Sequence, residues 1–117
     1  MDVNEKLNQA LNLISSEQFV EAEKILLPLA EHGSSKAQAR LGFLYLAGLE
    51  MGRDIELAEK WLLHAAHAGE GDAAHNLGTL YRTSAPDIPI DLEKSKEYFR
   101  LAKQLGFKVA PDEFYDE

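Results

Sequence analysis

The chain has 117 residues, of which 45% are hydrophobic, and this composition is typical of one globular domain with a buried core rather than of a disordered chain. Cysteine is absent, which excludes a disulfide framework and thiolate chemistry and favours the reducing cytoplasm. The formal net charge of −8, from 12 basic and 20 acidic residues, disfavours binding to nucleic acid or to anionic membrane surfaces.

Hydrophobic periodicity predicts six helices along the chain. Their expected bounds are about residues 2–15, 18–32, 35–48, 54–69, 72–83 and 91–105, and each odd helix is expected to pair with the next. The first stretch has an acid at position 2 and no unbroken apolar core, so we expect a helix there and not a secretory signal. No apolar run approaches the ~20 residues that a membrane span needs.

Several residues are predicted to begin or to distort these helices. Asp54 and Asp91 stand where an N-cap carboxylate would accept hydrogen bonds from free backbone N–H groups, and Asp72 is expected to do the same before Ala73. Pro28 lies in the last turns of the second helix and removes a backbone hydrogen bond, so a kink or early fraying is expected there.

Two phrases recur along the chain and indicate an internal repeat. The pattern Leu-Gly-x-x-Tyr occurs at residues 41–45 and again, 36 residues later, at 77–81. A second pattern is the apolar stripe of one helix within residues 58–66, which ends before Gly69 and recurs 36 residues earlier and 37 residues later. The one-residue difference between these two spacings falls in the proline-containing loop 84–91. We therefore expect a single domain, residues 1–117, with stacked units at about 2–34, 35–71 and 72–107 and an acidic tail at 108–117.

Two glycines lie inside predicted helices, at Gly42 and Gly78, where glycine costs about 1 kcal/mol relative to alanine. A close approach of the partner helix would offset this cost, because the missing Cβ leaves room for tight packing. The small residues expected to fill that room are Ala65, Ala66 and Ala102.

The stretch ARLGFLYLAGLEMGRDIELAEKWLLHAAHAGEGDAAHNLG resembles the Sel1-like repeat, a relative of the tetratricopeptide repeat. The resemblance lies in its Leu-Gly-x-x-Tyr, its loop Gly and Asp, and its Ala-x-x-Trp-x-x-x-Ala-Ala-x-x-Gly run, and it covers residues 37–72 and 73–106. The first unit lacks the Leu-Gly-x-x-Tyr phrase and is similar to a tetratricopeptide-type capping helix. This resemblance implies an all-α right-handed superhelix of about three antiparallel helix pairs, whose first helices line a concave groove, and an adaptor function.

Three histidines raise the alternative hypothesis of a metal-dependent hydrolase. His64 and His67 are one helical turn apart and His75 opens the next helix, but no HExxH motif or carboxylate at matched spacing accompanies them. The serines lie mostly at turns, without the strand–turn–helix context of a nucleophile. We therefore predict no catalytic residue, no metal and no cofactor. The aromatic residues of the repeat are expected in the core rather than around a ligand: Tyr45, Trp61, Tyr81, Tyr98 and Phe99.

Charge is distributed unevenly between the two helices of each pair. The acids concentrate in the second helices, whereas residues 36–48 and 73–83 contain basic residues and no Asp or Glu. If the family arrangement holds, these first helices make the groove mildly basic. The predicted partner-binding residues are Lys36, Arg40, Phe43, Leu46, His75, Thr79 and Arg82. Phe43 and Leu46 lie off the core stripe, and the alternative is that both pack against neighbouring first helices.

The leading prediction is a cytoplasmic, non-catalytic adaptor whose groove holds an acidic or amphipathic segment of another protein. The alternative is a small bacterial immunity or inhibitor protein that covers the basic active site of an enzyme. In that case the acidic second helices, with Glu56, Glu59 and Glu93, would make the contact. The tail is expected to cover the last repeat, and the alternatives are a disordered peptide motif or a ligand for the groove of a neighbouring copy.

Overall fold

The computed structural model describes residues 2–48, 54–83 and 88–107, and within these ranges the chain forms six α-helices and no β-strand. The helices are α1 (Val3–Ser15), α2 (Phe19–Glu31), α3 (Ser35–Ala47), α4 (Ile55–His67), α5 (Gly71–Arg82) and α6 (Leu92–Gln104). All six predicted helices are confirmed, with ends within two residues of those expected. The predictions for loop residues 84–87 and for the tail 108–117 lie outside the described residues.

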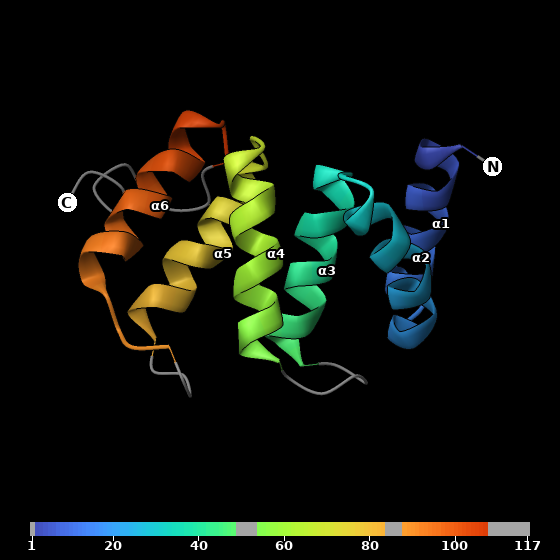
Figure 1. Ribbon diagram of the computed structural model, residues 1–117, viewed down its shortest axis with the longest axis horizontal. Helices are drawn as coiled ribbons and strands as arrows, with labels where there is room; N and C mark the ends of the chain where they lie inside the picture. Colours follow the sequence, from blue (N-terminus) through green and yellow to red (C-terminus); the bar gives the residue numbers. More distant parts are fainter. Residues whose placement is uncertain (1, 49–53, 84–87, 108–117) are drawn as a thin grey trace.

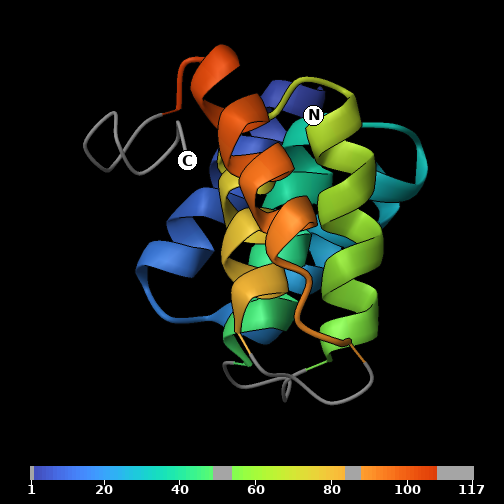
Figure 2. The same cartoon turned by 90° about the vertical axis from the view of Figure 1, so that its left-hand side faces the viewer.

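The helices stack one after another along the 43 Å long axis of the molecule, from α1 at one end to α6 at the other (Figure 1). Each helix packs on the next, and α3 also contacts α5. The view along the stack has α1, α3 and α5 towards one side and α2 and α4 towards the other (Figure 2). The fold is therefore the all-α helical-repeat solenoid that the sequence predicts. None of the described helices is both long and apolar enough to span a bilayer.

Side-chain caps fix where α4 and α6 begin. The carboxylates of Asp54 and Asp91 accept hydrogen bonds from the N–H groups of Leu57 and Lys94, each at 3.0 Å, which confirms both predicted N-caps. The prediction for Asp72 is wrong. Helix α5 begins one residue earlier than expected, with Glu70 as its N-cap residue, so Asp72 lies within the first turn, where its carboxylate accepts from the N–H of Ala73.

The second helices also end in a recurrent way. Gly69 and Gly106 adopt φ values of +102° and +88°, which glycine reaches without the steric cost that a side chain brings. The N–H group of the next residue then donates to the carbonyl five positions back, from Glu70 to Ala65 and from Phe107 to Ala102. This turn positions Glu70 and Phe107 on the side of the stack where the first helices lie.

Pro28 neither frays nor ends α2, which runs on to Glu31. Its carbonyl accepts hydrogen bonds from the backbone N–H and the ring of His32. Leu26, Leu29 and Ala30 around it are buried, so tertiary packing holds the helix together where one backbone hydrogen bond is missing. The predicted early fraying is therefore wrong.

The two helical glycines lie at close contacts within the helix pairs, as predicted, but against other residues than expected. A Cβ on Gly42 would lie 2.7 Å from Cγ of Leu62, and one on Gly78 would lie 2.6 Å from Cδ1 of Phe99. A large side chain of the second helix thus lies across bare backbone of the first, whereas the prediction had put Ala65, Ala66 and Ala102 there. In the last pair, Ser95 Oγ also donates to the Gly78 carbonyl at 2.7 Å.

A repeated hydrogen bond joins each pair to the next. The hydroxyl of Tyr45 donates to Glu23, and that of Tyr81 donates to Glu59, both at 2.6 Å and both across 22 residues. Burial, and then the hydrogen bond to the carboxylate, raises the pKa of both phenols, so both remain donors at neutral pH. All five aromatic residues predicted in the core are buried, Trp61, Tyr98 and Phe99 included.

Replacement of Gly42 or Gly78 by alanine is expected to lower the free energy of unfolding in urea. Overpacking costs about 1–3 kcal/mol, which exceeds the ~1 kcal/mol that alanine gains in helix propensity. The control is Thr79→Ala, an exposed position beside Gly78, which should change stability by less than ~0.5 kcal/mol. Unchanged or raised stability in both glycine variants would contradict a tight helix contact.

Loss of the Tyr81 hydroxyl, in Tyr81→Phe, is expected to cost about 1–2 kcal/mol of unfolding free energy, because a short hydrogen bond to a carboxylate disappears. Tyr98→Phe is the matched control, since its hydroxyl is 3.4 Å from His67 Nε2, and its loss should be smaller. A double-mutant cycle with Glu59→Gln measures the coupling between the two groups. Equal losses in the two tyrosine variants would remove any special role for this bond.

Candidate functional site

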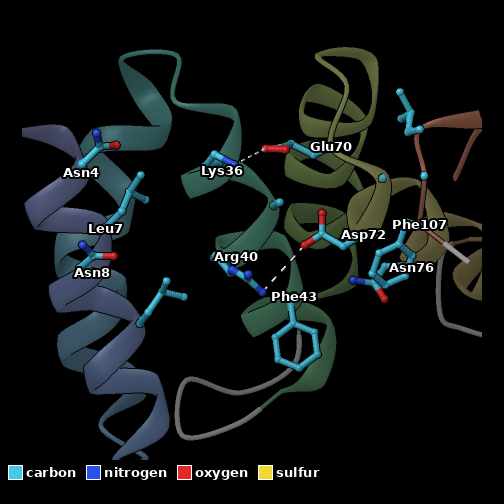
Figure 3. Close-up of a pocket in the computed structure, with 15 residues that line it drawn as sticks. Asn4, Leu7, Asn8, Lys36, Arg40, Phe43, Glu70, Asp72, Asn76 and Phe107 are labelled. Atoms are coloured by element: carbon cyan, nitrogen blue, oxygen red, sulfur yellow. Dashed lines mark ion pairs between the residues drawn. The ribbon is translucent and has the colours of Figure 1, made fainter. Parts of the chain in front are cut away.

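The first helices of the three pairs enclose an open groove of about 980 Å³ (Figure 3). We call it the α1–α3–α5 groove. Helices α2 and α4 contribute no residue to its lining. The lining residues are Asn4, Leu7, Asn8 and Leu11 of α1, Lys36, Ala39, Arg40 and Phe43 of α3, Glu70, Gly71, Asp72 and Asn76 at and after the start of α5, and Leu105, Gly106 and Phe107 after α6.

The repeat explains why these positions share one face. Residues four apart lie on the same side of a helix, one turn above each other. Lys36 and Arg40 form such a pair on α3, and the residues 36 positions later, Asp72 and Asn76, form the equivalent pair on α5. Asn4 and Asn8 supply a third pair on α1, shifted by one helical turn from the repeat, since Asn4 lies 36 residues before Arg40. Figure 3 shows α3 between α1 and α5, so the pair on α3 has a polar pair on either side.

The two cations of the groove face carboxylates of the neighbouring repeat. Lys36 Nζ is 3.9 Å from Glu70 and Arg40 Nη1 is 3.9 Å from Asp72 (Figure 3). The cationic side chains are 75% and 48% exposed, whereas Glu70 and Asp72 are 18% and 32% exposed. Ion pairs this long, with the cationic partner exposed, contribute about 0–1 kcal/mol, so the cations remain accessible to a ligand.

Apolar side chains complete the groove. Phe43 is 42% exposed, and Leu11 and Leu105 are also exposed large hydrophobic residues. Grouped exposed apolar side chains with polar neighbours are typical of binding surfaces. The groove therefore offers apolar contacts and cationic groups to the same ligand.

The structure brings three of the seven predicted partner-binding residues together in the groove: Lys36, Arg40 and Phe43. Leu46 does not line the groove and is a partly buried side chain packed against the core. Thr79 and Arg82 are exposed on α5 and do not line the groove. The groove uses the edge of α5 that carries Asp72 and Asn76, which lies roughly 70° around the helix from the predicted edge of His75, Thr79 and Arg82.

His75 lies next to the groove rather than in it. Its ring centroid is 5.1 Å from that of Phe99 and 5.3 Å from that of Phe107, and its Nδ1 is buried with no hydrogen-bond partner among the described residues. Burial lowers the pKa of the imidazole, because the charged form loses its hydration. The histidine therefore serves in packing as a neutral ring.

Sequence reasoning missed the contributions of α1 and of the two acids. The sequence assigns the first helix to a cap on the basis of apolar residues such as Leu11, and that pattern says nothing of Asn4 and Asn8, which share the four-residue spacing of Lys36 and Arg40. Glu70 and Asp72 precede the acid-free stretch that begins at residue 73, so the charge pattern of the sequence does not reveal them. The recurrent four-residue spacing of polar residues was a signal for Asn4, Asn8 and Asp72, whereas Leu11 and Glu70 belong to no such pair.

The three histidines of the hydrolase hypothesis lie in three different surroundings. His64 lies beside Trp61, His67 beside Tyr98, and His75 beside two phenylalanines. Across the part of the chain that the structure describes, no group of three or more His, Cys, Asp or Glu side chains is arranged to hold a metal ion.

The stability of the protein is expected to fall as pH drops below about 6.5, the pKa of an unperturbed histidine, in part because of His75. Its pKa is lowered in the folded state, so the unfolded chain binds the proton more readily and protonation favours unfolding. Urea unfolding at pH 7.5 and 5.5 should show a smaller loss of stability for His75→Gln than for the parent. His64→Gln, at an exposed position, is the control, and equal losses in all three proteins would contradict the role of His75.

Comparison with known proteins agrees with this architecture. The family model of the Sel1 repeat matches residues 35–70 and 71–107, which together are more than half of the chain. The crystal structure of a Sel1 repeat protein from Oxalobacter formigenes is similar, with a TM-score of 0.75, 25% sequence identity and coverage of 85% of this chain. The chain spans 39% of the length of that protein. Two matched repeats on a shared helical fold establish that the chain belongs to the Sel1 repeat family.

Proposed function

We propose that this protein is a cytoplasmic, non-catalytic adaptor that binds a segment of another protein in the α1–α3–α5 groove. Sel1 repeat proteins generally mediate protein–protein interaction. The observation that carries the proposal is the convergence of exposed cationic and apolar side chains, Lys36, Arg40 and Phe43, on one groove built by successive repeats. The absence of cysteine supports the cytoplasmic location.

The helices make this site rigid before any partner arrives. Lys36, Arg40 and Phe43 project from one helix whose backbone is held against α4 at Gly42. A partner therefore meets contact groups whose backbone is already ordered, which lowers the entropic cost of association. Three units, at about residues 2–34, 35–71 and 72–107, are each needed in this proposal, because each supplies one polar pair to the groove.

Two cations and two carboxylates line the groove, and the greater exposure of the cations favours an acidic or amphipathic partner segment. Lys36 and Arg40 extend further into solvent than Glu70 and Asp72, so an approaching partner meets the cations first. Phe43 and Leu11 supply the apolar contact beside them. A nucleic acid is not the proposed ligand, because the chain as a whole carries a net charge of −8.

Site-specific photocrosslinking in the cell of origin tests this proposal. A benzoylphenylalanine at position 43 is expected to give a crosslinked protein adduct, and Arg40→Glu in the same chain should reduce its yield several-fold. The same probe at position 56, in the exposed first turn of α4, is the control and should give none. Adducts only from position 56 would overturn the groove as the binding site and favour the inhibitor alternative, which uses the acidic helices.

A further inference from the structure

On the basis of this proposed function, we infer that the partner segment binds along α3 as an extended chain, with an acidic side chain held by Lys36 and Arg40 and a large apolar side chain two residues away beside Phe43. The inference names the backbone form and the side-chain chemistry of the ligand. It rests on three features of the groove, namely unpaired amides, a cation pair and an adjacent apolar surface.

The amide side chains favour an extended ligand over a helical one. Asn4, Asn8 and Asn76 line the groove, and none of them makes a side-chain hydrogen bond to another described residue. An amide can donate and accept at once, as the backbone of an extended peptide requires. A helix satisfies its own backbone internally and needs an apolar groove rather than amides. Amides on both the α1 and α5 sides therefore match the exposed edges of an extended chain.

The cation pair selects a carboxylate and also restricts where it can lie. Lys36 and Arg40 are one turn apart on α3, and their contacts to Glu70 and Asp72 are long, at 3.9 Å. A ligand carboxylate would replace these contacts with shorter charge-assisted hydrogen bonds. Glu70 and Asp72 repel a second carboxylate on the α5 side. The acidic residue of the ligand must therefore lie on the α1 side, and a long acidic run is disfavoured.

The apolar contact sets the spacing within the ligand. Phe43 follows Arg40 by three residues, which is a rise of about 4.5 Å along α3. Alternate side chains of an extended chain point the same way and are roughly 6.6 Å apart, a distance that the long arginine side chain can accommodate. Leu11 of α1 adds apolar surface to the groove. This spacing predicts an acidic residue two positions from a Phe, Leu, Ile, Met, Tyr or Trp.

A phage-displayed library of random dodecapeptides, selected on the full chain, tests the inference. The enriched peptides are expected to share the acidic and apolar pair at this spacing. The affinity of a labelled enriched peptide is measured by fluorescence anisotropy. Lys36→Glu and Arg40→Glu in the protein should each lower this affinity about ten-fold or more. Replacing the acidic residue of the peptide by its amide, Gln for Glu or Asn for Asp, should lower it to the same extent. Asn8→Ala and N-methylation of the peptide backbone should each weaken binding several-fold.

Lys96→Glu is the matched control, because it makes the same charge change on the exposed part of α6 and should leave affinity unchanged. Enriched peptides that are basic or helical, or equal losses for Lys36→Glu and Lys96→Glu, would overturn the inference. So would a dimer in sedimentation that Arg40→Glu dissociates, since a second copy would then be the occupant. For basic or helical peptides, and for equal losses, a crosslink from position 43 to another protein would still support the proposed function. A crosslink only to a second copy of this chain, or no crosslink at all, would overturn the proposed function as well.

Discussion

The contact between a glycine of the first helix and a large side chain of the second determines how each of the last two pairs packs. Leu62 lies on Gly42 and Phe99 lies on Gly78, at distances that leave no room for a Cβ. This contact fixes the rotation of α3 and α5 about their own axes as well as their distance from α4 and α6. The face opposite the glycine is therefore fixed too, and that face carries Lys36, Arg40 and Asn76 into the groove.

A second interaction holds each helix pair against the preceding pair. The bonds from Tyr45 to Glu23 and from Tyr81 to Glu59 each join a first helix to the second helix of the preceding pair. The tyrosine is the last residue of the Leu-Gly-x-x-Tyr phrase, so one short phrase contains both the glycine of the intra-pair contact and the donor of the inter-pair contact. The recurrence of the phrase at 36 residues follows from these two packing requirements.

The fold could be predicted from the sequence because its determinants are local. Apolar spacing defined six helices, and Asp54 and Asp91 marked two of their beginnings. The groove was only partly predictable, because its charge depends on residues from different repeats. Lys36 and Arg40 look like an unopposed basic pair in the sequence, and only the stacking of α5 on α3 brings Glu70 and Asp72 to them. Asp72 was misassigned as a cap for a related reason, since a shift of one residue in the start of α5 moves its side chain to the groove.

The internal pairing of Lys36 with Glu70 and of Arg40 with Asp72 has a consequence for the protein in a crowded cell. Two cations and two carboxylates give the empty groove a formal charge of zero, so abundant polyanions such as ribosomal RNA gain little by settling there. Glu70 and Asp72 act as the counterions of Lys36 and Arg40. Ligand binding here therefore releases fewer dissolved ions than ligand binding to two unpaired cations would release. Under the proposed function, affinity at this site would therefore be less sensitive to ionic strength than its lysine and arginine suggest, and selectivity would come from a ligand that can displace the built-in carboxylates.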